Sequence, residues 1–171
     1  MTADLRKGGI AVLDFGSQYT QLIARRIREL GVYAEVVAHD ATPDQLAEHE
    51  PRGIILSGGP NSIYEDDAPT LTPGLLIEDG EHPVLGVCYG MQLVAHQLGG
   101  QVEPGTTREY GPGHIAVDHT DNPLFNGLPD ELDVWMSHGD HVEQVPEGFH
   151  VLAKSGNGIL AAIRHETKHI Y

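Results

Sequence analysis

The residues best suited to do chemistry in this sequence surround its single cysteine, Cys88. Residues 83–87 before it form a short apolar run with strand composition, and the apolar residues after it recur at helical spacing as far as Leu98. A strand that enters a helix through Gly-x-Cys-x-Gly has the form of a nucleophile elbow, whose apex is strained and whose neighbours must be small. A thiol at this apex lies at a helix N-terminus, which favours the thiolate. The pattern predicts a nucleophile, and the alternative is a buried small hydrophobic residue.

Attack by a thiolate on a carbonyl needs hydrogen-bond donors for the oxyanion that develops. One donor comes with the elbow, because the backbone N–H of Tyr89 follows the nucleophile directly. We expect the second donor at Gly59, since a glycine loop after a neighbouring strand lets the backbone approach closely. An ordinary tight turn is the alternative for residues 57–60. A phosphate cradle is disfavoured because no Lys-Ser or Lys-Thr follows, as it does in a P-loop.

A general base is harder to assign among the 11 histidines. His138 follows an apolar segment with strand composition and is one candidate. The pair His165-Glu166 is disfavoured, because adjacent residues of a strand point to opposite faces and cannot act as base and orienting group. One cysteine and the lack of a His-Glu-x-x-His motif also disfavour a zinc site, so we expect no metal ligands here.

The elements that must position these residues alternate between strand and helix in the first half of the chain. Expected strands cover residues 9–14, 34–37, 53–56 and 83–87, and helical spacing occurs in residues 23–30, 43–50 and 91–98. This alternation predicts a parallel sheet with helices on both faces. Ligands of such sheets bind at the carboxyl ends of the strands, where the Gly58-Gly59 loop and Cys88 both fall.

After Gly100 the pattern changes to short strands separated by turn signals. The expected strands are residues 113–117, 132–136, 150–153 and 160–163, with turns at residues 121–123, 146–148 and 156–158. We interpret them as an antiparallel section added to the parallel sheet. The fold prediction is therefore α/β with a mixed, mainly parallel central sheet flanked by helices, in one domain over residues 1–171.

Composition excludes several classes of protein. A formal charge of −15 disfavours a nucleic-acid surface, which needs clustered Lys and Arg. No apolar run approaches the roughly 20 residues of a membrane span, and residues 1–9 lack the apolar segment of a secretory signal. One cysteine permits no internal disulfide and favours a reducing, cytoplasmic setting.

Five motifs, in order along nearly the whole chain, give the sequence a family resemblance. They are residues 12–18 (VLDFGSQ), 57–60 (SGGP), 86–92 (GVCYGMQ), 108–111 (REYG) and 135–140 (WMSHGD). The chain resembles the class I glutamine amidotransferases, whose fold is flavodoxin-like. The last two motifs narrow the resemblance to the amidotransferase domains of glutamine-hydrolysing GMP synthetases.

The resemblance implies a role for each matching residue. Cys88 would attack the side-chain amide of glutamine, release ammonia and form a γ-glutamyl thioester, with Gly59 and Tyr89 as oxyanion donors. The α-amino and α-carboxylate groups of glutamine would be held by the following residues: Gln92, Ser137, His138, Gly139 and Asp140. Ammonia would then pass to a synthetase domain that uses ATP and Mg²⁺ to convert xanthosine monophosphate to GMP. The resemblance leaves open whether that domain is on the same chain and whether the full enzyme is a homodimer.

The sequence departs from the family in one respect. The family's catalytic His and Glu lie in a Gly-Val-Gln-Phe-His-Pro-Glu motif just after a tyrosine like Tyr171, and that motif and the synthetase domain are not in these 171 residues. General acid–base catalysis contributes about a hundredfold to ten-thousandfold in rate, so we expect this chain to bind glutamine with little or no turnover. Two other hypotheses stay open: another cysteine hydrolase with His138 as its base, and a non-catalytic glutamine-binding module.

Overall fold

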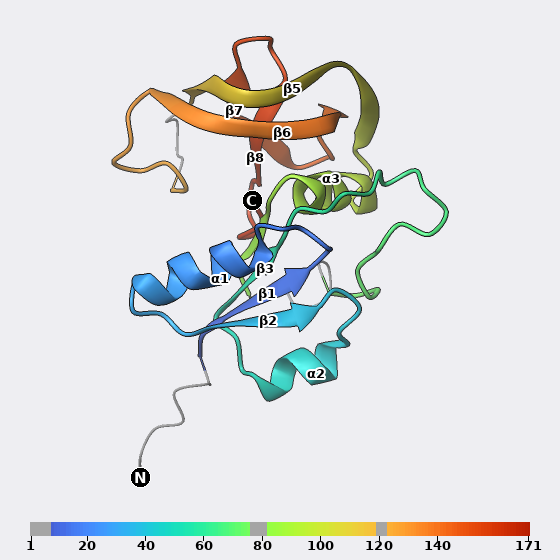
Figure 1. Ribbon diagram of the computed structural model, residues 1–171, viewed down its shortest axis with the longest axis vertical. Coiled ribbons are helices and arrows are strands. Elements are labelled where there is room, and N and C mark those ends of the chain that lie inside the picture. Colours follow the sequence, from blue (N-terminus) through green and yellow to red (C-terminus); the bar gives the residue numbers. More distant parts are fainter. Residues whose placement is uncertain (1–7, 76–81, 119–122) are drawn as a thin grey trace. The chain divides into compact units, whose positions relative to one another are not determined.

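The computed structural model describes residues 8–75, 82–118 and 123–171, which form two compact units (Figure 1). The first unit runs to Val94 and includes Ile170, and the second runs from Ala95 to His169 and includes Tyr171. Most of residues 1–9, on which the expectation about a secretory signal rests, and most of the turn expected at 121–123 lie outside the described residues. A single domain over residues 1–171 stays a prediction.

The first unit is built on a parallel sheet of strand order β2-β1-β3-β4. Its strands are β1 (Ile10–Asp14), β2 (Ala34–Ala38), β3 (Gly53–Leu56) and β4 (Val84–Gly86), and its helices are α1 (Thr20–Glu29), α2 (Pro43–Glu48) and the start of α3 (Tyr89–Gln97). The order matches that of flavodoxin-like doubly wound sheets. The predicted parallel section is therefore confirmed, with each expected strand and helix in place.

Helix α1 covers one face of this sheet, and α2 lies on the opposite side (Figure 1). Alternate strand residues point to the same face, so Val12 of β1 and Ala34 of β2 pack against Ala24 of α1 in one buried cluster. The intervening residues of β1, Ala11 and Leu13, are also buried. Burial on both faces explains why β1 appears in the sequence as a continuous apolar run rather than as an alternating one.

Local hydrogen bonds define the start of α2 and the end of α1. Thr42 opens α2 with a capping box, in which its hydroxyl accepts from the Gln45 N–H and the Gln45 side chain accepts from the Thr42 N–H. Gly31 ends α1 in a left-handed conformation, with φ of 79°. Its N–H donates to the Arg28 carbonyl and that of Val32 donates to Ile27, which is a Schellman motif.

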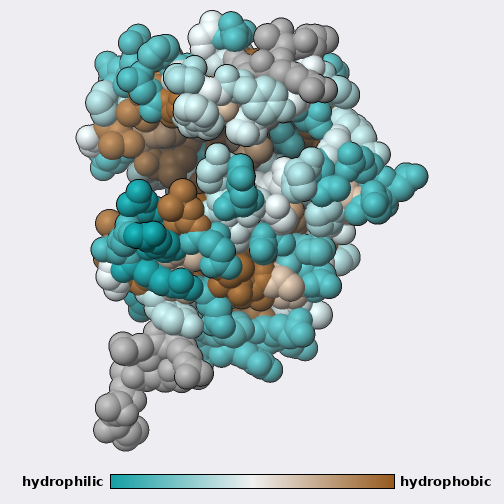
Figure 2. All heavy atoms as spheres, in the orientation of Figure 1, coloured by the Kyte–Doolittle hydropathy of each residue, from teal (hydrophilic) through white to brown (hydrophobic). Residues whose placement is uncertain are grey.

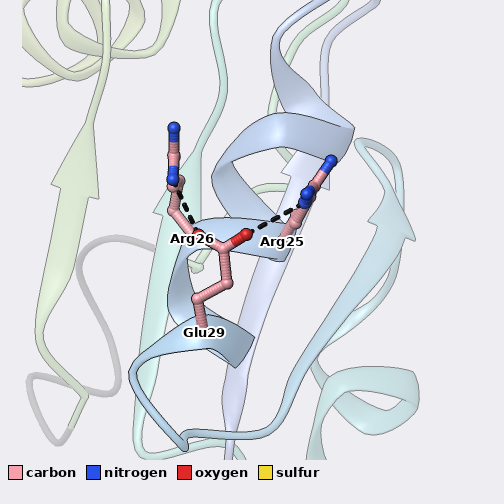
Figure 3. Close-up of polar contacts among 3 residues, drawn as sticks. All are labelled: Arg25, Arg26 and Glu29. Atoms are coloured by element: carbon pink, nitrogen blue, oxygen red, sulfur yellow. Dashed lines mark hydrogen bonds and ion pairs between the residues drawn. The ribbon is translucent and has the colours of Figure 1, made fainter.

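The outer surface of α1 carries a charge cluster of three side chains (Figure 3). Glu29 accepts hydrogen bonds from Arg25 at 3.0 Å and from Arg26 at 2.8 Å. Both hydrogen bonds lower the pKa of the Glu29 carboxyl, and the bond from Arg26 has the larger effect. All three groups are solvent-exposed, so the cluster adds little to stability.

The second unit is an antiparallel sheet of order β6-β5-β7-β8. Its strands are β5 (Gln101–Val117), β6 (Glu131–Gln144), β7 (Phe149–Ser155) and β8 (Leu160–His165). The structure confirms the α/β class and refines one expectation: in the described residues these strands form a sheet of their own rather than extending the parallel one. The strands β5 to β8 pair with one another. The strand β4 of the parallel sheet forms an isolated parallel bridge, between Val84 and Ile170.

The two long strands β5 and β6 have one packed face and one exposed face. Ile115 pairs with Leu132 on the packed face, where both contribute to a hydrophobic cluster that includes Leu152. On the outer face Tyr110 and Trp135 are 64% and 69% exposed. The alternation of exposed and packed residues in 110–117 and 131–137 is typical of antiparallel sheets with one solvated face.

Hydrophilic residues cover much of the face seen in Figure 2, and hydrophobic ones gather there in small patches. The described part of the chain has no helix that is long and apolar enough to cross a membrane.

Candidate active site

Cys88 lies at the sharp turn between β4 and α3, with a φ of 53°. This left-handed conformation is uncommon for a residue with a side chain and stores strain that the surrounding structure must offset. Two hydrogen bonds tie the turn to β3, since Val87 N–H donates to Leu56 O at 2.9 Å and Gly90 N–H donates to Ser57 O at 3.1 Å. The geometry is that of the predicted elbow.

The glycines on either side of Cys88 are required by close backbone approaches. A Cβ atom on Gly86 would lie 2.6 Å from the Gly90 carbonyl oxygen. A Cβ on Gly90 would overlap the Leu56 carbonyl oxygen and lie 2.7 Å from the Leu56 Cβ. Both contacts are shorter than real Cβ atoms make, so only glycine fits at either position.

The Cys88 thiol is half-buried and belongs to the N-terminus of α3. The Cys88 carbonyl accepts the Gln92 N–H at 3.1 Å, which is a first-turn hydrogen bond of this helix. The partial positive charge of a helix N-terminus favours a thiolate over a thiol. A strained, half-buried position at a helix N-terminus suits a nucleophile better than a packing residue.

Gly59 and Tyr89, the two predicted oxyanion donors, belong to adjacent segments. A Cβ on Gly59 would lie 2.6 Å from the Phe15 carbonyl oxygen and 3.4 Å from Cγ of Tyr89. Tyr89 is only 1% exposed, and its ring packs 5.7 Å from that of Phe15. The loop after β3 is therefore held between the end of β1 and the first residue of α3. The donor role of each N–H stays a prediction.

The Tyr89 hydroxyl anchors the start of α3 by donating to the Pro69 carbonyl at 2.7 Å. Burial raises the pKa of this phenol, and the nearby Glu65 carboxylate raises it further. The hydroxyl therefore stays protonated and remains a donor over the whole physiological range.

Two side chains of the sequence motifs to which we assigned no role, Asp14 and Ser17, lie in the segment next to this region. The Asp14 carboxylate accepts from Gly16 N–H at 2.9 Å and from the Thr20 hydroxyl at 2.8 Å, which closes the turn after β1. A Cβ on Gly58 would lie 3.5 Å from the Cys88 Cβ and 3.6 Å from the Ser17 hydroxyl oxygen. Short polar residues directly after buried strands are the signal that could have identified them.

The predicted glutamine-binding residues are divided between the two units. Gln92 is 5% exposed in α3, within the same unit as Cys88. The other four residues lie on β6 in the antiparallel unit: Ser137, His138, Gly139 and Asp140. This segment continues the strand, where Ser137 pairs with Tyr110 and His138 with Glu109, instead of following it as expected. The side chains of His138 and of residues 106–109 lie outside what is described. The glutamine-binding roles stay predictions.

His165, disfavoured as a base, has a structural role. Its Nδ1 accepts from the N–H groups of Thr167 and Lys168 at 3.1 Å each, and its ring packs edge-on against Phe149. Partial burial and then the Lys168 charge lower its pKa, which favours the neutral ring. Glu166 pairs instead with His150 at 3.3 Å, so it does not orient His165.

No group of three or more His, Cys, Asp or Glu side chains suited to a metal ion occurs within residues 8–75, 82–118 and 123–171. The absence of metal ligands in this domain stays a prediction for the chain as a whole.

A family model for class-I glutamine amidotransferases matches residues 11–171. The chain belongs to this family. It is 54% identical over 157 residues to a glutamine-hydrolysing GMP synthase of Thermomicrobium roseum. This match covers 92% of this chain and 29% of that relative. It is 51% identical over 162 residues to the corresponding enzyme of Lactobacillus acidophilus, covering 95% of this chain and 31% of the relative. The chain thus spans about a third of the length of these relatives.

Solved structures agree with this assignment. A protein of Thermoplasma acidophilum described as one subunit of a GMP synthase superposes with a TM-score of 0.86 at 33% identity, over 96% of this chain and 81% of that one. A glutamine amidotransferase of Thermotoga maritima superposes with a TM-score of 0.74 over 95% of this chain and 73% of that one. Its identity of 21% supports the fold alone.

Proposed function

We propose that this chain is the glutamine-hydrolysing part of a GMP synthetase, with Cys88 as its nucleophile. The observation that carries the proposal is the Cys88 turn itself, with its positive φ, its obligatory glycines and its place at the start of α3. The relatives named above support the choice of enzyme, since they are GMP synthases at 51–54% identity.

The proposed chemistry is acyl transfer through a thioester. The Cys88 thiolate attacks the side-chain carbonyl carbon of glutamine, and the oxyanion that forms accepts hydrogen bonds from the N–H groups of Gly59 and Tyr89. The carbon–nitrogen bond then breaks, and ammonia leaves after taking up a proton. Water attacks the γ-glutamyl thioester, which releases glutamate and restores the thiol. Gln92 and the Ser137–Asp140 segment hold the α-amino and α-carboxylate groups of glutamine.

Ammonia formed in this way would aminate xanthosine monophosphate in a synthetase region that uses ATP and Mg²⁺. Two arrangements have support among the relatives. The curated GMP synthases are about three times as long as the matched segment, whereas this chain covers 81% of the Thermoplasma protein. The synthetase region is thus a partner either on the same polypeptide or on a second one, and the complete enzyme would work in the cytoplasm. We assign ATP and Mg²⁺ to that region, with no cofactor, nucleic acid or membrane bound by this domain.

Full turnover also needs an acid–base group, which protonates the departing nitrogen in its acidic form and activates water in its basic form. In the family this work belongs to the His and Glu of the His-Pro-Glu motif, which these 171 residues do not contain. We expect the chain by itself to form a covalent adduct at Cys88 but to hydrolyse glutamine about a hundredfold to ten-thousandfold more slowly than a complete enzyme.

A diazoketone analogue of glutamine tests the proposal directly. The Cys88 sulfur displaces dinitrogen from this reagent and forms a stable thioether, which intact-mass measurement detects. We expect one adduct on the unaltered chain, its formation slowed by excess glutamine, and none on Cys88→Ser. A folded chain that forms no adduct, or that reacts at a rate insensitive to glutamine, would contradict the proposal.

The same assay separates the two open alternatives. Another cysteine hydrolase would form an adduct that glutamine does not block, and His138→Ala would abolish its hydrolytic activity while thiol reactivity persisted. A non-catalytic module would bind glutamine equally well after Cys88→Ser and would form no covalent adduct with the analogue.

A further inference from the structure

Ser57 makes hydrogen bonds to the segments around Cys88, and the proposed mechanism gives it no role. It follows β3 directly and is fully buried, with 0% exposure. Its backbone N–H donates to the Leu13 carbonyl at 3.1 Å, and its carbonyl accepts from Gly90 N–H at 3.1 Å. Its backbone therefore joins the end of β1 to the start of α3.

The Ser57 hydroxyl makes two further bonds. Its Oγ accepts from Phe15 N–H at 3.0 Å and donates to the Gly58 carbonyl oxygen at 2.9 Å. The single O–H of this buried hydroxyl and one of its two lone pairs are thus used by backbone groups. It links the turn after β1 to the glycine loop after β3.

The bond to the Gly58 carbonyl has a direct consequence for the next residue. The Gly58 carbonyl and the Gly59 N–H belong to one planar peptide group, in which the two bonds point in opposite directions. Holding the carbonyl therefore sets the direction of the Gly59 N–H. With glycine on both sides, little else in the local chain restrains rotation of this peptide group.

We propose that Ser57 is a positioning residue that aims the Gly59 N–H at the oxyanion through the hydrogen bond from its hydroxyl to the Gly58 carbonyl. The inference rests on the proposed function, because it assigns the Gly59 N–H a task in that chemistry. Phe15 completes the arrangement: its N–H binds Ser57, and its carbonyl oxygen limits the room around Gly59.

Two reagents separate positioning from a general structural effect. The diazoketone analogue of glutamine reacts through a carbonyl that the oxyanion donors polarise, whereas iodoacetamide alkylates the thiolate at a methylene carbon and needs no such donors. The quantity to measure is the ratio of the two rate constants at Cys88. Loss of one oxyanion donor costs about a hundredfold to a thousandfold, so misdirecting it in Ser57→Ala should lower the ratio at least about tenfold.

Ser155→Ala is the matched control. Ser155 is 8% exposed and its hydroxyl accepts the Ile159 N–H at 3.3 Å, but it lies in the antiparallel unit. We expect an unchanged ratio for this variant. If Ser57→Ala does not fold, Ser57→Gly takes its place, since it also removes the hydroxyl and adds no second thiol to the chain.

An unchanged ratio in the folded Ser57 variant, or an equal fall in both rates, would overturn the positioning role. That result is distinct from failure of the proposed function, in which the unaltered chain would already fail to react with the glutamine analogue.

Discussion

The two units of this protein use their strands in different ways. In the parallel unit the strands are three to five residues long, and polar side chains such as Asp14 and Ser57 bind backbone groups at or just beyond the strand ends. In the antiparallel unit β5 and β6 are 17 and 14 residues long, and alternate residues in 110–117 and 131–137 are exposed.

This difference shows where each unit tolerates change. The ends of the parallel strands are close to one another and to Cys88, so an added atom there meets backbone within 3 Å at several positions. The outer face of β5 and β6 carries large side chains with few neighbours, and substitutions at such positions usually change stability little. Substitutions should therefore destabilise the parallel unit most at its strand ends, and the antiparallel unit most on its packed face.

The largest effect should come from Gly90→Ala, which tests the tightness of the parallel unit. The new methyl group would overlap the Leu56 carbonyl oxygen, which is backbone and cannot move aside. We expect a loss of about 3 kcal/mol or more in the free energy of unfolding, measured by urea titration.

Gly156→Ala is the control for that change. Gly156 has no atom within 4 Å of the added Cβ and no positive φ, so its effect should stay within about 0.5 kcal/mol. Similar losses for the two variants would contradict the contrast between the units.

A second effect, of comparable or smaller size, should distinguish the two faces of the antiparallel sheet. Leu152 is 2% exposed in the hydrophobic cluster, and Leu152→Ala should cost about 2–5 kcal/mol through lost burial and a residual cavity. Trp135 is the larger side chain but is 69% exposed, and Trp135→Ala should cost no more than about 0.5 kcal/mol. Equal costs in thermal or urea unfolding would show that something covers the outer face.

The smallest effect concerns pH and His165. Partial burial and the Lys168 charge lower its pKa below the ordinary value of about 6.5, so the neutral ring is favoured in the folded state. Its contribution is fully present above about pH 6.5 and is lost as the pH falls towards the lower folded pKa. Protonation places hydrogen on Nδ1, which then cannot accept from Thr167 and Lys168.

His165→Asn retains a side-chain acceptor near the same place but does not titrate. We expect its melting temperature to fall less than that of the unaltered chain between about pH 8 and pH 5.5. His150→Asn serves as control, because His150 is exposed and pairs only with Glu166 among the contacts resolved there. If the melting temperature of His165→Asn depends on pH as strongly as that of the unaltered chain, other histidines cause the dependence.

Much of the parallel unit could be predicted because its signals are local. The glycines around Cys88, the helix stop at Gly31 and the capping box at Thr42 each act within a few residues. Sequence patterns were less informative for β6. Its predicted end at Met136 was too early, because pairing with β5 continues beyond an irregularity between Pro104 and Glu109.

The sequence by itself determined the elbow, since the strain at Cys88 and the small neighbours it needs are properties of one short segment. Only the tertiary structure decided the role of Ser57. Its hydroxyl binds the N–H of Phe15, which lies 42 residues away, and the two meet because β1 and β3 are adjacent in the sheet. Hydrogen bonds between the ends of neighbouring strands depend on strand order and register, which no local pattern specifies.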